Sequence, residues 1–465
     1  MEIQPFKNKT YYVVGLGRSG LSTLKALTHQ GATVFAWDDT LAQRTHAKKA
    51  GFTVIHPEKL DWESLTALVL SPGIPHMLPK PHLVAHLAAR YRTPIICDID
   101  LFFKTLAGPT IVGVTGSNGK STTTTLINHV LNHAGHTAAA GGNLGVPTFE
   151  LPHLDAKGTY VVELSSYQLE RITTPALSAS VFLNITPNHL ERHGDMARYQ
   201  QAKLHIFDLL KPHGTKIIGV DNPLMEAIYQ SLSDAYTIPI SGQKQLQKGV
   251  YIDNGILIDH LATLPKEILK VTTLPHLKGA HNYQNIAACY AVCRAVHQLS
   301  PERIIKGLKT YEGLPHRQEH VAQHHNITYI NDSKATSIDA ASHALAAYKN
   351  IFWLVGGKPK TDSFDITPAH TSFGHIQRVY AFGEAAKNYD ILFSKHLPTA
   401  TFEGLEKALK QATEDALLEK ENITILLAPA CASFDQYKNF EERGDHFKKV
   451  VKKIIETLTK KRRKA

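Results

Sequence analysis

The chain has 465 residues, of which 43% are hydrophobic and 20% are charged, a composition typical of globular proteins. This length is too great for a single hydrophobic core and predicts two or three domains. No run is apolar enough to cross a bilayer, residues 1–5 show no basic and apolar leader, and 4 cysteines are too few for a disulfide framework, so we expect a protein of the reducing cytoplasm. The net charge of +10 comes mostly from residues 448–464, which contribute +8 without interleaved aromatic side chains, so we expect no nucleic-acid partner.

Residues 1–105 alternate short apolar strands with helical stretches, as a parallel α/β sheet requires. Strands are predicted at residues 10–14, 33–37 and 68–70. The first strand runs into a glycine-rich turn at residues 15–20 and a helix over residues 21–29. This turn and Asp38, at the end of the second strand, fit a NAD fingerprint, but the same turn can hold any diphosphate. A second nucleotide is therefore an equal interpretation.

Residues 106–310 carry the most informative motif, a strand that breaks into a glycine-rich loop just before a helix begins. The segment reads Ile111-Val-Gly-Val-Thr-Gly-Ser-Asn-Gly-Lys-Ser-Thr122. Backbone N–H groups of such a loop bind phosphate oxygens, the Lys120 ammonium would neutralise phosphate charge, and the Ser121 hydroxyl would help to hold Mg²⁺. The usual pattern has a glycine where Val114 stands. Gly-Lys-Ser-Thr at the start of a helix nevertheless argues against a strand–turn–helix that contains glycine and lysine by chance. The motif predicts a protein that handles a nucleoside triphosphate.

Polar side chains follow the next strands of this block, which are predicted at residues 160–162, 179–183 and 216–220. Glu163 directly follows the first of these strands, in the position of a metal ligand. His189 follows the second and could be a ligand or an orienting residue. Lys203 is predicted in the interior of a helix over residues 199–207, where an unmodified lysine would repel Mg²⁺, so a surface or salt-bridged role is the plainer interpretation. A further helix over residues 281–297 carries Cys289 and Cys293 four residues apart, as a core pair.

Residues 311–465 repeat the α/β alternation. Their strands are predicted at residues 327–330, 351–355, 379–382 and 423–427. Each strand ends in a polar or glycine-containing turn, where open α/β sheets place their ligand sites. The expected fold is therefore α/β with three domains, over residues 1–105, 106–310 and 311–465. Two Rossmann-like sheets, parallel or mostly parallel, flank a central domain of the P-loop ATPase type.

The ordered set of motifs resembles the Mur ligases of peptidoglycan synthesis over nearly the whole chain. The motifs lie at residues 15–20, 71–73, 115–122, 141–145, 163–170, 184–189, 313–317, 331–336 and 429–435. The phosphate loop and the His-Arg pair at 316–317 are similar to those of the whole family. Glu-Leu-Ser-Ser-Tyr-Gln at 163–168 and Pro-Ala-Cys-Ala-Ser at 429–433 favour the member that adds D-glutamate.

This resemblance implies an ATP-dependent amide ligase. ATP would phosphorylate the carboxylate of a UDP-muramoyl-alanine, the amine of D-glutamate would attack the acyl phosphate, and a tetrahedral intermediate would expel phosphate. Such a transfer depends mostly on positioning and on neutralisation of charge. The resemblance also implies two Mg²⁺ ions, small molecules as the only partners, and a monomer in the cytoplasm.

The resemblance further implies roles for individual residues. Lys120, His189 and Lys203 would be catalytic. Lys203 matches a lysine that CO₂ converts to a carbamate, and this carbamate would hold metal together with Ser121, Glu163 and His189. ATP would be bound by Gly116, Ser117, Asn118, Gly119, Lys120, Ser121, Thr122, Asn282, Asn285, Arg317, Asp332 and Lys334. The UDP substrate would be bound by Arg18, Ser19, Gly20, Asp38, Asp39, Gly73, Asn143, Ser165 and Gln168. D-glutamate would be bound by Thr336, Lys360, Ser433 and Phe440.

Two segments depart from the family pattern. The segment Gly356-Gly-Lys-Pro-Lys360 stands where the family has Gly-Gly-x-Gly-Lys. Lys358 could therefore compete with Lys360 for the side chain of D-glutamate. Asp38-Asp39-Thr40 lacks the Asp-Thr-Arg of some members.

Three other interpretations stay open from the sequence. One is another amide ligase of the same superfamily, which adds a different amino acid or adds glutamate to a folate. The second is a dinucleotide-dependent oxidoreductase built on Gly15–Gly20, which leaves residues 116–121 and 331–336 without a role. The third is a non-catalytic nucleotide-binding protein.

Overall fold

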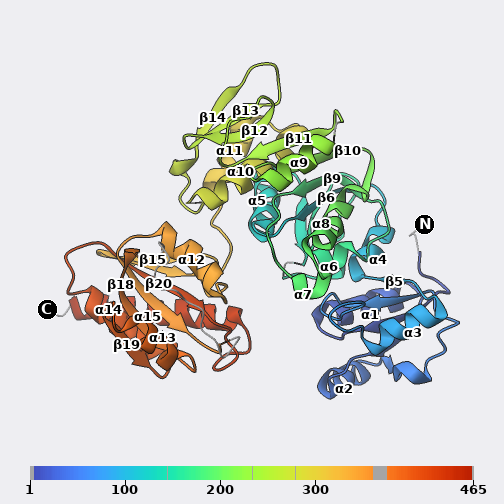
Figure 1. Ribbon diagram of the computed structural model, residues 1–465, viewed down its shortest axis with the longest axis horizontal. Helices are drawn as coiled ribbons and strands as arrows, with labels where there is room; N and C mark the ends of the chain where they lie inside the picture. Colours follow the sequence, from blue (N-terminus) through green and yellow to red (C-terminus); the bar gives the residue numbers. More distant parts are fainter. Residues whose placement is uncertain (1–4, 144, 233, 278, 360–373, 463–465) are drawn as a thin grey trace. The chain divides into compact units, whose positions relative to one another are not determined.

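The computed structural model describes residues 5–143, 145–232, 234–277, 279–359 and 374–462. The chain divides into two compact units. Unit 1 comprises Met1–Leu274 with Ala280–Tyr311, and unit 2 comprises Pro275–Gly279 with Glu312–Ala465. The described residues form three sheets, two in unit 1 and one in unit 2, and most neighbouring strands are parallel (Figure 1). The predicted α/β class is confirmed.

The first sheet of unit 1 has the strand order β3-β2-β1-β4-β5, with every pair of neighbours parallel. This is the strand order of the doubly wound nucleotide-binding sheet, without its sixth strand. Its strands are β1 (Thr10–Val14), β2 (Thr33–Trp37), β3 (Thr53–Val54), β4 (Ala67–Leu70) and β5 (Ile95–Ile96), and its helices are α1 (Arg18–His29), α2 (Leu41–Lys49) and α3 (Leu83–Tyr91). Alternate side chains of β1 pack on opposite faces. Tyr11 and Val13 share a core with Leu24 of α1, whereas Tyr12 and Val14 share one with Val84 of α3.

The second sheet of unit 1 has the order β14-β13-β12-β11-β10-β9-β6-β8-β7. It is parallel from β7 to β12 and ends in an antiparallel meander, β12-β13-β14. Its strands are β6 (Thr110–Thr115), β7 (Ala138–Gly142), β8 (Thr159–Glu163), β9 (Leu177–Phe182), β10 (Leu210–Gly219), β11 (Thr237–Ser241), β12 (Gly249–Asp253), β13 (Ile256–His260) and β14 (Lys266–Lys270). Its helices are α5 (Lys120–His133), α6 (Ser166–Leu169), α7 (Leu190–His193), α8 (Met196–Leu204), α9 (Pro223–Ser231), α10 (Tyr283–Ala295) and α11 (Pro301–Thr310).

Helix α4 (Asp98–Thr105) joins the two sheets of unit 1. Its Leu101 belongs to the core of the first sheet. Its Ile99, Phe102 and Phe103 belong to the core under β6 and β8. The two sheets of unit 1 therefore share a buried helix.

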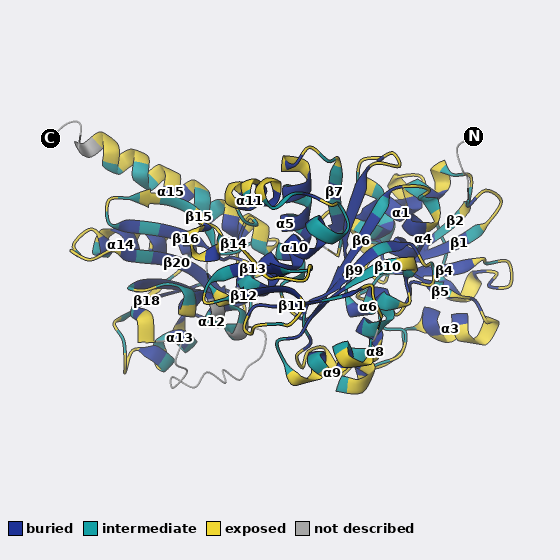
Figure 2. Cartoon of the chain, turned by 90° about the horizontal axis from the view of Figure 1, so that it is seen from above, coloured by how far each residue is buried: buried dark blue, intermediate teal, exposed yellow. Residues whose placement is uncertain are grey.

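Unit 2 contains one sheet with the order β15-β16-β20-β17-β18-β19, antiparallel between β15 and β16 and parallel elsewhere. Its strands are β15 (Glu319–His324), β16 (Ile327–Asn331), β17 (Ile351–Gly356), β18 (Ile376–Phe382), β19 (Thr399–Phe402) and β20 (Ile423–Ala430), and its helices are α12 (Ile338–Ala347), α13 (Ala386–Phe393), α14 (Leu405–Ala416) and α15 (Phe440–Arg462). Helices α12 and α13 pack on one face, and α14 and α15 pack on the other. Figure 2 shows the central strands of this sheet as buried and the outer faces of its helices as exposed.

Several element boundaries differ from the prediction. Helix α1 begins at Arg18 rather than residue 21, because Gly17 is its N-cap. Helix α8 ends at Leu204 and continues as a 3₁₀ turn, His205–Phe207, so Lys203 lies in its last turn rather than in its interior. Cys289 and Cys293 are free and buried in α10, as predicted. Within the described residues, no helix is both long and apolar enough to cross a membrane.

Candidate active site

The loop between β6 and α5 has the geometry of a phosphate-binding turn. Gly116 and Gly119 adopt positive φ angles of 154° and 82°, and Gly119 is the N-cap of α5. A Cβ on Gly119 would lie 2.3 Å from Asn285 Oδ1, so no other residue fits there without displacing that side chain. The first backbone bond of the helical ladder joins Thr123 N–H to the Gly119 carbonyl. The N–H groups of Lys120, Ser121 and Thr122 therefore precede the ladder, at the end of the helix that attracts anions.

Asn184, which follows β9, holds this loop from one side. The Ser117 N–H donates to the Asn184 carbonyl at 2.9 Å, and the Asn118 N–H donates to Asn184 Oδ1 at 2.9 Å. The Ser117 hydroxyl lies 3.0 Å from the Tyr199 hydroxyl. Two of the N–H groups that we expected to meet phosphate are thus already used within the protein. Asn184 lay in a quoted motif and directly after a predicted strand, but neither it nor Tyr199 was assigned a role from the sequence.

Two lysines converge on one carbonyl oxygen of the loop. Lys120 Nζ and Lys203 Nζ each donate to the Gly116 carbonyl at 2.9 Å. Lys203 is 2% exposed, also contacts Thr115 Oγ1 at 3.4 Å, and pairs with no carboxylate in the described part of the chain. Burial, and then the charge of Lys120, lowers the pKa of Lys203 well below its usual range, although Glu163 opposes the shift. Loss of the Lys203 proton, or chemical modification of its amine, removes the repulsion between the two ammonium groups.

Glu163 is the last residue of β8. It pairs with Val114 of β6, the strand that leads into the phosphate-binding loop. It is 2% exposed. Its Oε1 accepts from Asn143 Nδ2 at 2.8 Å, whereas its Oε2 is buried and has no hydrogen-bond partner among the described residues. A buried carboxylate oxygen without a partner costs free energy unless a cation or a proton reaches it.

His189 lies at the start of α7, in a left-handed conformation with φ of 56°. Its side chain is 44% exposed. Burial lowers the pKa of His189, and Lys120 and Lys203 lower it further, against the opposing charge of Glu191. A neutral imidazole is the form that binds a metal ion.

The residues present fit a magnesium site in which the phosphates of the substrate supply some of the ligands. Among the described residues, no group of three or more His, Cys, Asp and Glu side chains could hold a metal ion. Mg²⁺ commonly binds one or two carboxylates, keeps several waters and takes the remaining ligands from phosphates. The unpartnered Oε2 of Glu163, close to the phosphate loop, meets that requirement.

The residues expected to bind the UDP substrate gather at strand ends in unit 1, where several are hydrogen-bonded or ion-paired to other parts of the protein. Asp38 accepts from the N–H groups of Leu16 and Thr40 at 2.7 and 2.8 Å, which shapes the glycine-rich turn. Asp39 lies 2.8 Å from His82 Nε2. Arg18 forms an ion pair with Glu150 at 2.6 Å, and its Nη1 donates to the Gly145 carbonyl.

The Ser165 hydroxyl and Gln168 side chain bond to each other at 2.8 Å and cap α6. Most of these polar groups are therefore paired inside the protein.

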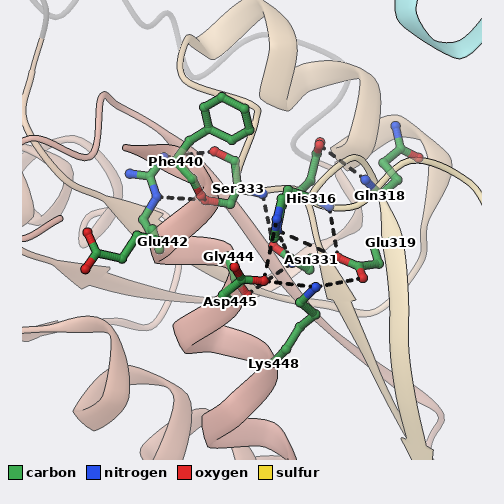
Figure 3. Close-up of polar contacts among 12 residues, drawn as sticks. His316, Gln318, Glu319, Asn331, Ser333, Phe440, Glu442, Gly444, Asp445 and Lys448 are labelled. Carbon is green, nitrogen blue, oxygen red and sulfur yellow. Dashed lines mark hydrogen bonds and ion pairs between the residues drawn. The ribbon is translucent and has the colours of Figure 1, made fainter. Parts of the chain in front are cut away.

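In unit 2, the expected ATP and D-glutamate residues lie just before β15, after β16 and β20, and at the start of α15. Figure 3 shows Phe440 at the start of α15, where its carbonyl accepts from the Ser333 hydroxyl. Lys334 Nζ lies 4.0 Å from the centre of the Phe440 ring. Ser433 is buried, and burial raises the pKa of Asp332 to about 7. His316 Nδ1 lies 3.0 Å from Asn331 Nδ2.

The other residues of this part of unit 2 are constrained by close packing or by backbone hydrogen bonds. A Cβ on Gly444 would meet His316 Nδ1 at 2.1 Å. The backbone of Lys358 forms a bridge with Ala432. Thr336 donates its N–H to the Lys334 carbonyl. Lys360 lies outside the described residues.

Comparison with known proteins matches this architecture. Residues 114–293 match the Mur ligase middle domain. A protein of Paramagnetospirillum magneticum named UDP-N-acetylmuramoylalanine–D-glutamate ligase is 42% identical over 448 residues, which is 96% of each chain. A protein of the same name from Caulobacter vibrioides is 39% identical over 458 residues, which is 97% of each chain. The chain belongs to the Mur ligase family.

Solved Mur ligases share the fold. UDP-N-acetylmuramate-alanine ligase from Thermotoga maritima superposes with a TM-score of 0.57 at 16% identity, covering 96% of this chain and 99% of that one. The MurF ligase of Thermotoga maritima, solved in complex with ADP, gives a TM-score of 0.54 at 16% identity and covers 97% of each chain. The predicted resemblance to Mur ligases is confirmed over nearly the whole length.

Proposed function

We propose that this Mur ligase joins D-glutamate to UDP-N-acetylmuramoyl-L-alanine in peptidoglycan precursor synthesis, in the cytoplasm where ATP and UDP-linked sugars are available. The ATP γ-phosphoryl group is transferred to the alanyl carboxylate, which gives an acyl phosphate and ADP. The D-glutamate amine then attacks the acyl carbon, and the tetrahedral intermediate expels phosphate to leave an amide bond. The names of relatives that are 36–42% identical over nearly the full chain support this choice of substrates.

The observation that carries the chemistry is the pair of lysines on the Gly116 carbonyl, next to the unpartnered oxygen of Glu163. Two ammonium groups so close together repel each other, so Lys203 gives up its charge, as described below, while Lys120 stays a cation beside a triphosphate at the N-terminus of α5. Lys120 then neutralises charge that develops on the transferred phosphoryl group. The loop N–H groups of Lys120, Ser121 and Thr122 orient the phosphates.

Glu163, Ser121 and His189 would hold Mg²⁺, with Lys203 as a carbamate. Bound Mg²⁺ would neutralise phosphate charge and polarise a phosphoryl oxygen. The depressed pKa of Lys203 favours the neutral amine that reacts with CO₂, and the product is an anion with oxygen ligands in place of a repelling cation.

The remaining site residues keep the roles that the family resemblance implies. The UDP moiety is bound by the first block of the chain, near Ser19, Asp38, Asp39 and Gly73. The muramoyl part is bound by Asn143, Ser165 and Gln168. Asn282, Asn285, Arg317, Asp332 and Lys334 bind ATP, and Thr336, Lys360, Ser433 and Phe440 bind D-glutamate.

The test is the amino acid that the purified monomeric chain attaches. The protein is incubated with ATP, Mg²⁺, UDP-N-acetylmuramoyl-L-alanine and one amino acid at a time, and product mass and phosphate release are measured. We expect product with D-glutamate and none with L-glutamate, L-lysine or meso-diaminopimelate. Product with another of these amino acids, or NAD-dependent oxidation in place of ligation, would contradict the proposal.

A further inference from the structure

Two arginines together bind five consecutive backbone carbonyls at the end of β4. Arg171 Nη1 donates to the carbonyls of Leu70 and Ser71 at 2.9 Å each, and its Nη2 donates to that of Ile74 at 2.7 Å. Arg192 Nη2 donates to the carbonyl of Pro72 at 3.2 Å and its Nη1 to that of Gly73 at 3.0 Å. Every carbonyl from residue 70 to residue 74 thus points toward a guanidinium group.

The Arg171 guanidinium loses hydration free energy in this position, because it is buried. Arg171 is 2% exposed, its Nε has no hydrogen-bond partner among the described residues, and its Nη2 also contacts His76 Nδ1 at 3.1 Å. Its strongest contacts are neutral carbonyls rather than a carboxylate. A buried guanidinium held in this way costs desolvation free energy that a purely packing role would not require. The fixed fork of an arginine nevertheless matches several carbonyls of one tight turn.

Arg192 is held in place by the segment that carries the expected muramoyl residues. Its guanidinium lies 4.5 Å from the centre of the Tyr167 ring, and this ring also stacks on His193 at 5.3 Å and lies 5.1 Å from the His189 ring. His193 Nδ1 pairs with Glu170 at 2.9 Å, and its Nε2 contacts the Ser166 hydroxyl at 2.9 Å. Both arginines therefore stand on α6, α7 and their flanks, next to Ser165 and His189.

The opposite side of the turn is open. Gly73 is exposed, a Cβ there would meet nothing within 4 Å, and its N–H has no acceptor in the described part of the chain. The Ser71 hydroxyl donates to the Gly15 carbonyl at 3.0 Å, which ties the turn to the glycine-rich turn after β1. The Ser71 N–H donates to the Val14 carbonyl, the Ile74 N–H donates to the Ser71 carbonyl, and Pro72 has no N–H. The exposed Gly73 N–H is therefore the donor that this turn can offer to a phosphate oxygen.

We propose that Arg171 and Arg192 are positioning residues that fix the turn at residues 70–74 for the diphosphate of the UDP substrate, and hold it in register with the muramoyl and metal residues. This inference rests on the proposed function. It assigns to the two arginines the distance between the nucleotide end and the reacting end of one substrate. A turn free to shift by about 1 Å would meet the diphosphate poorly and so would weaken binding of the UDP substrate.

The first test is Arg192→Lys, with Arg198→Lys as the matched control. Lysine keeps the charge but lacks the fork that reaches two carbonyls. Arg198 lies on α8 with a 64% exposed side chain that pairs with Asp195, and among the described residues it has no hydrogen bond to the turn at residues 70–74. We expect Arg192→Lys to raise KM for the UDP substrate about tenfold, because two charge-assisted bonds are lost or weakened. KM for ATP should stay within twofold, kcat should change less than KM, and Arg198→Lys should match wild type.

Titration with UDP alone separates this inference from the proposed function. If wild type binds no UDP, the proposed function is at fault. If wild type binds UDP and Arg192→Lys binds it equally tightly, or if KM for the UDP substrate stays within twofold while kcat falls, the positioning role is overturned. Arg171→Lys provides the second variant, and thermal unfolding of each variant shows that it is folded. For Arg171→Lys we expect the same selective loss of UDP affinity, larger than for Arg192→Lys because three carbonyls are involved.

Discussion

Lys203 is buried in the last turn of α8 with its ammonium group directed at a carbonyl oxygen and a hydroxyl, while a second lysine shares that carbonyl. A cation in such a place is stable only if it loses its proton or gains an anionic partner. The proposed carbamate meets both conditions, because it consumes the neutral amine and creates an anion. The same residue is otherwise hard to explain, since the described residues offer it no ion pair.

Lys203→Ala should be nearly inactive. We expect formate or acetate, but not chloride, to restore part of the phosphate release, because a small carboxylate can fill the missing oxygen-ligand position. The matched control is Lys120→Ala, which removes the other lysine of the Gly116 carbonyl and should not respond to carboxylates. Full activity of Lys203→Ala in CO₂-depleted buffer would show that Lys203 is only structural.

Lys120→Ala should lose about 10²–10³ in kcat while it keeps its fold, because one contact to developing charge is removed. Lys120 also donates to the carbonyls of Gly116 and Ser117. Single-turnover phosphate release measures the loss, and circular dichroism shows whether the chain keeps its overall secondary structure. Near-wild-type ATP-dependent phosphate release would remove Lys120 from the proposed chemistry.

At the scale of elements, the first residue of α4, Asp98, is stabilised by the helix dipole and destabilised by its burial. Asp98 stands in the first turn, where a carboxylate complements the helix dipole. It is also 8% exposed, and its Oδ1 has no hydrogen-bond partner among the described residues. Burial outweighs the backbone hydrogen bonds and the charge of Arg171, and it raises the pKa of Asp98 to about 6.

This pKa predicts how the free energy of unfolding depends on pH. Between about pH 4 and pH 6 the native state binds the Asp98 proton more tightly than the unfolded chain, so stability falls as pH rises and the loss is complete above pH 6. The loss is on the order of 3 kcal/mol, from a shift of about two pH units. Asp98→Asn should remove this component. Denaturant unfolding at pH 4.5 and pH 8 would show wild type losing more stability than the variant over that interval. Equal pH dependence of the two proteins would contradict the prediction.

The sequence predicts central strands well and peripheral ones poorly. Strands β1, β6, β17 and β20 are continuous apolar runs, because both of their faces are covered, and all were found within a few residues of their ends. β3 and β5 have two residues each, too few for any periodicity. The β12–β13 hairpin was missed although Asn254-Gly255 lies between two alternating runs, a strong hairpin signal that could have found it.

Site residues follow the same division. The sequence indicates Glu163, His189 and the phosphate loop because each follows a strand that the sequence shows, and their roles stay predictions. Arg171 and Arg192 were not, because their partners are backbone carbonyls about a hundred residues away, and backbone groups leave no mark in the sequence. Pairing of this kind becomes visible only when the fold brings the turn and the arginines together.

At the scale of the whole molecule, each compact unit has cores of its own. Leu24 belongs to a core of unit 1 and Leu345 to a core of unit 2, and both are 0% exposed. Chains built of separate cores need not unfold in a single transition. We expect two calorimetric transitions, which Leu24→Ala and Leu345→Ala would assign, because each lowers the stability of its own unit by about 2–5 kcal/mol.

UDP should then raise the midpoint of the unit 1 transition alone. The expected UDP residues Ser19, Asp38, Asp39 and Gly73 all belong to unit 1. A ligand at a hundred times its Kd stabilises the native state by about 2.7 kcal/mol, which corresponds to several degrees for a unit of this size. NAD at the same concentration is the control and should shift neither midpoint. A shift confined to the unit 2 transition would show that the first sheet does not bind the uridine diphosphate, and a shift by NAD equal to that by UDP would show that this sheet does not select UDP.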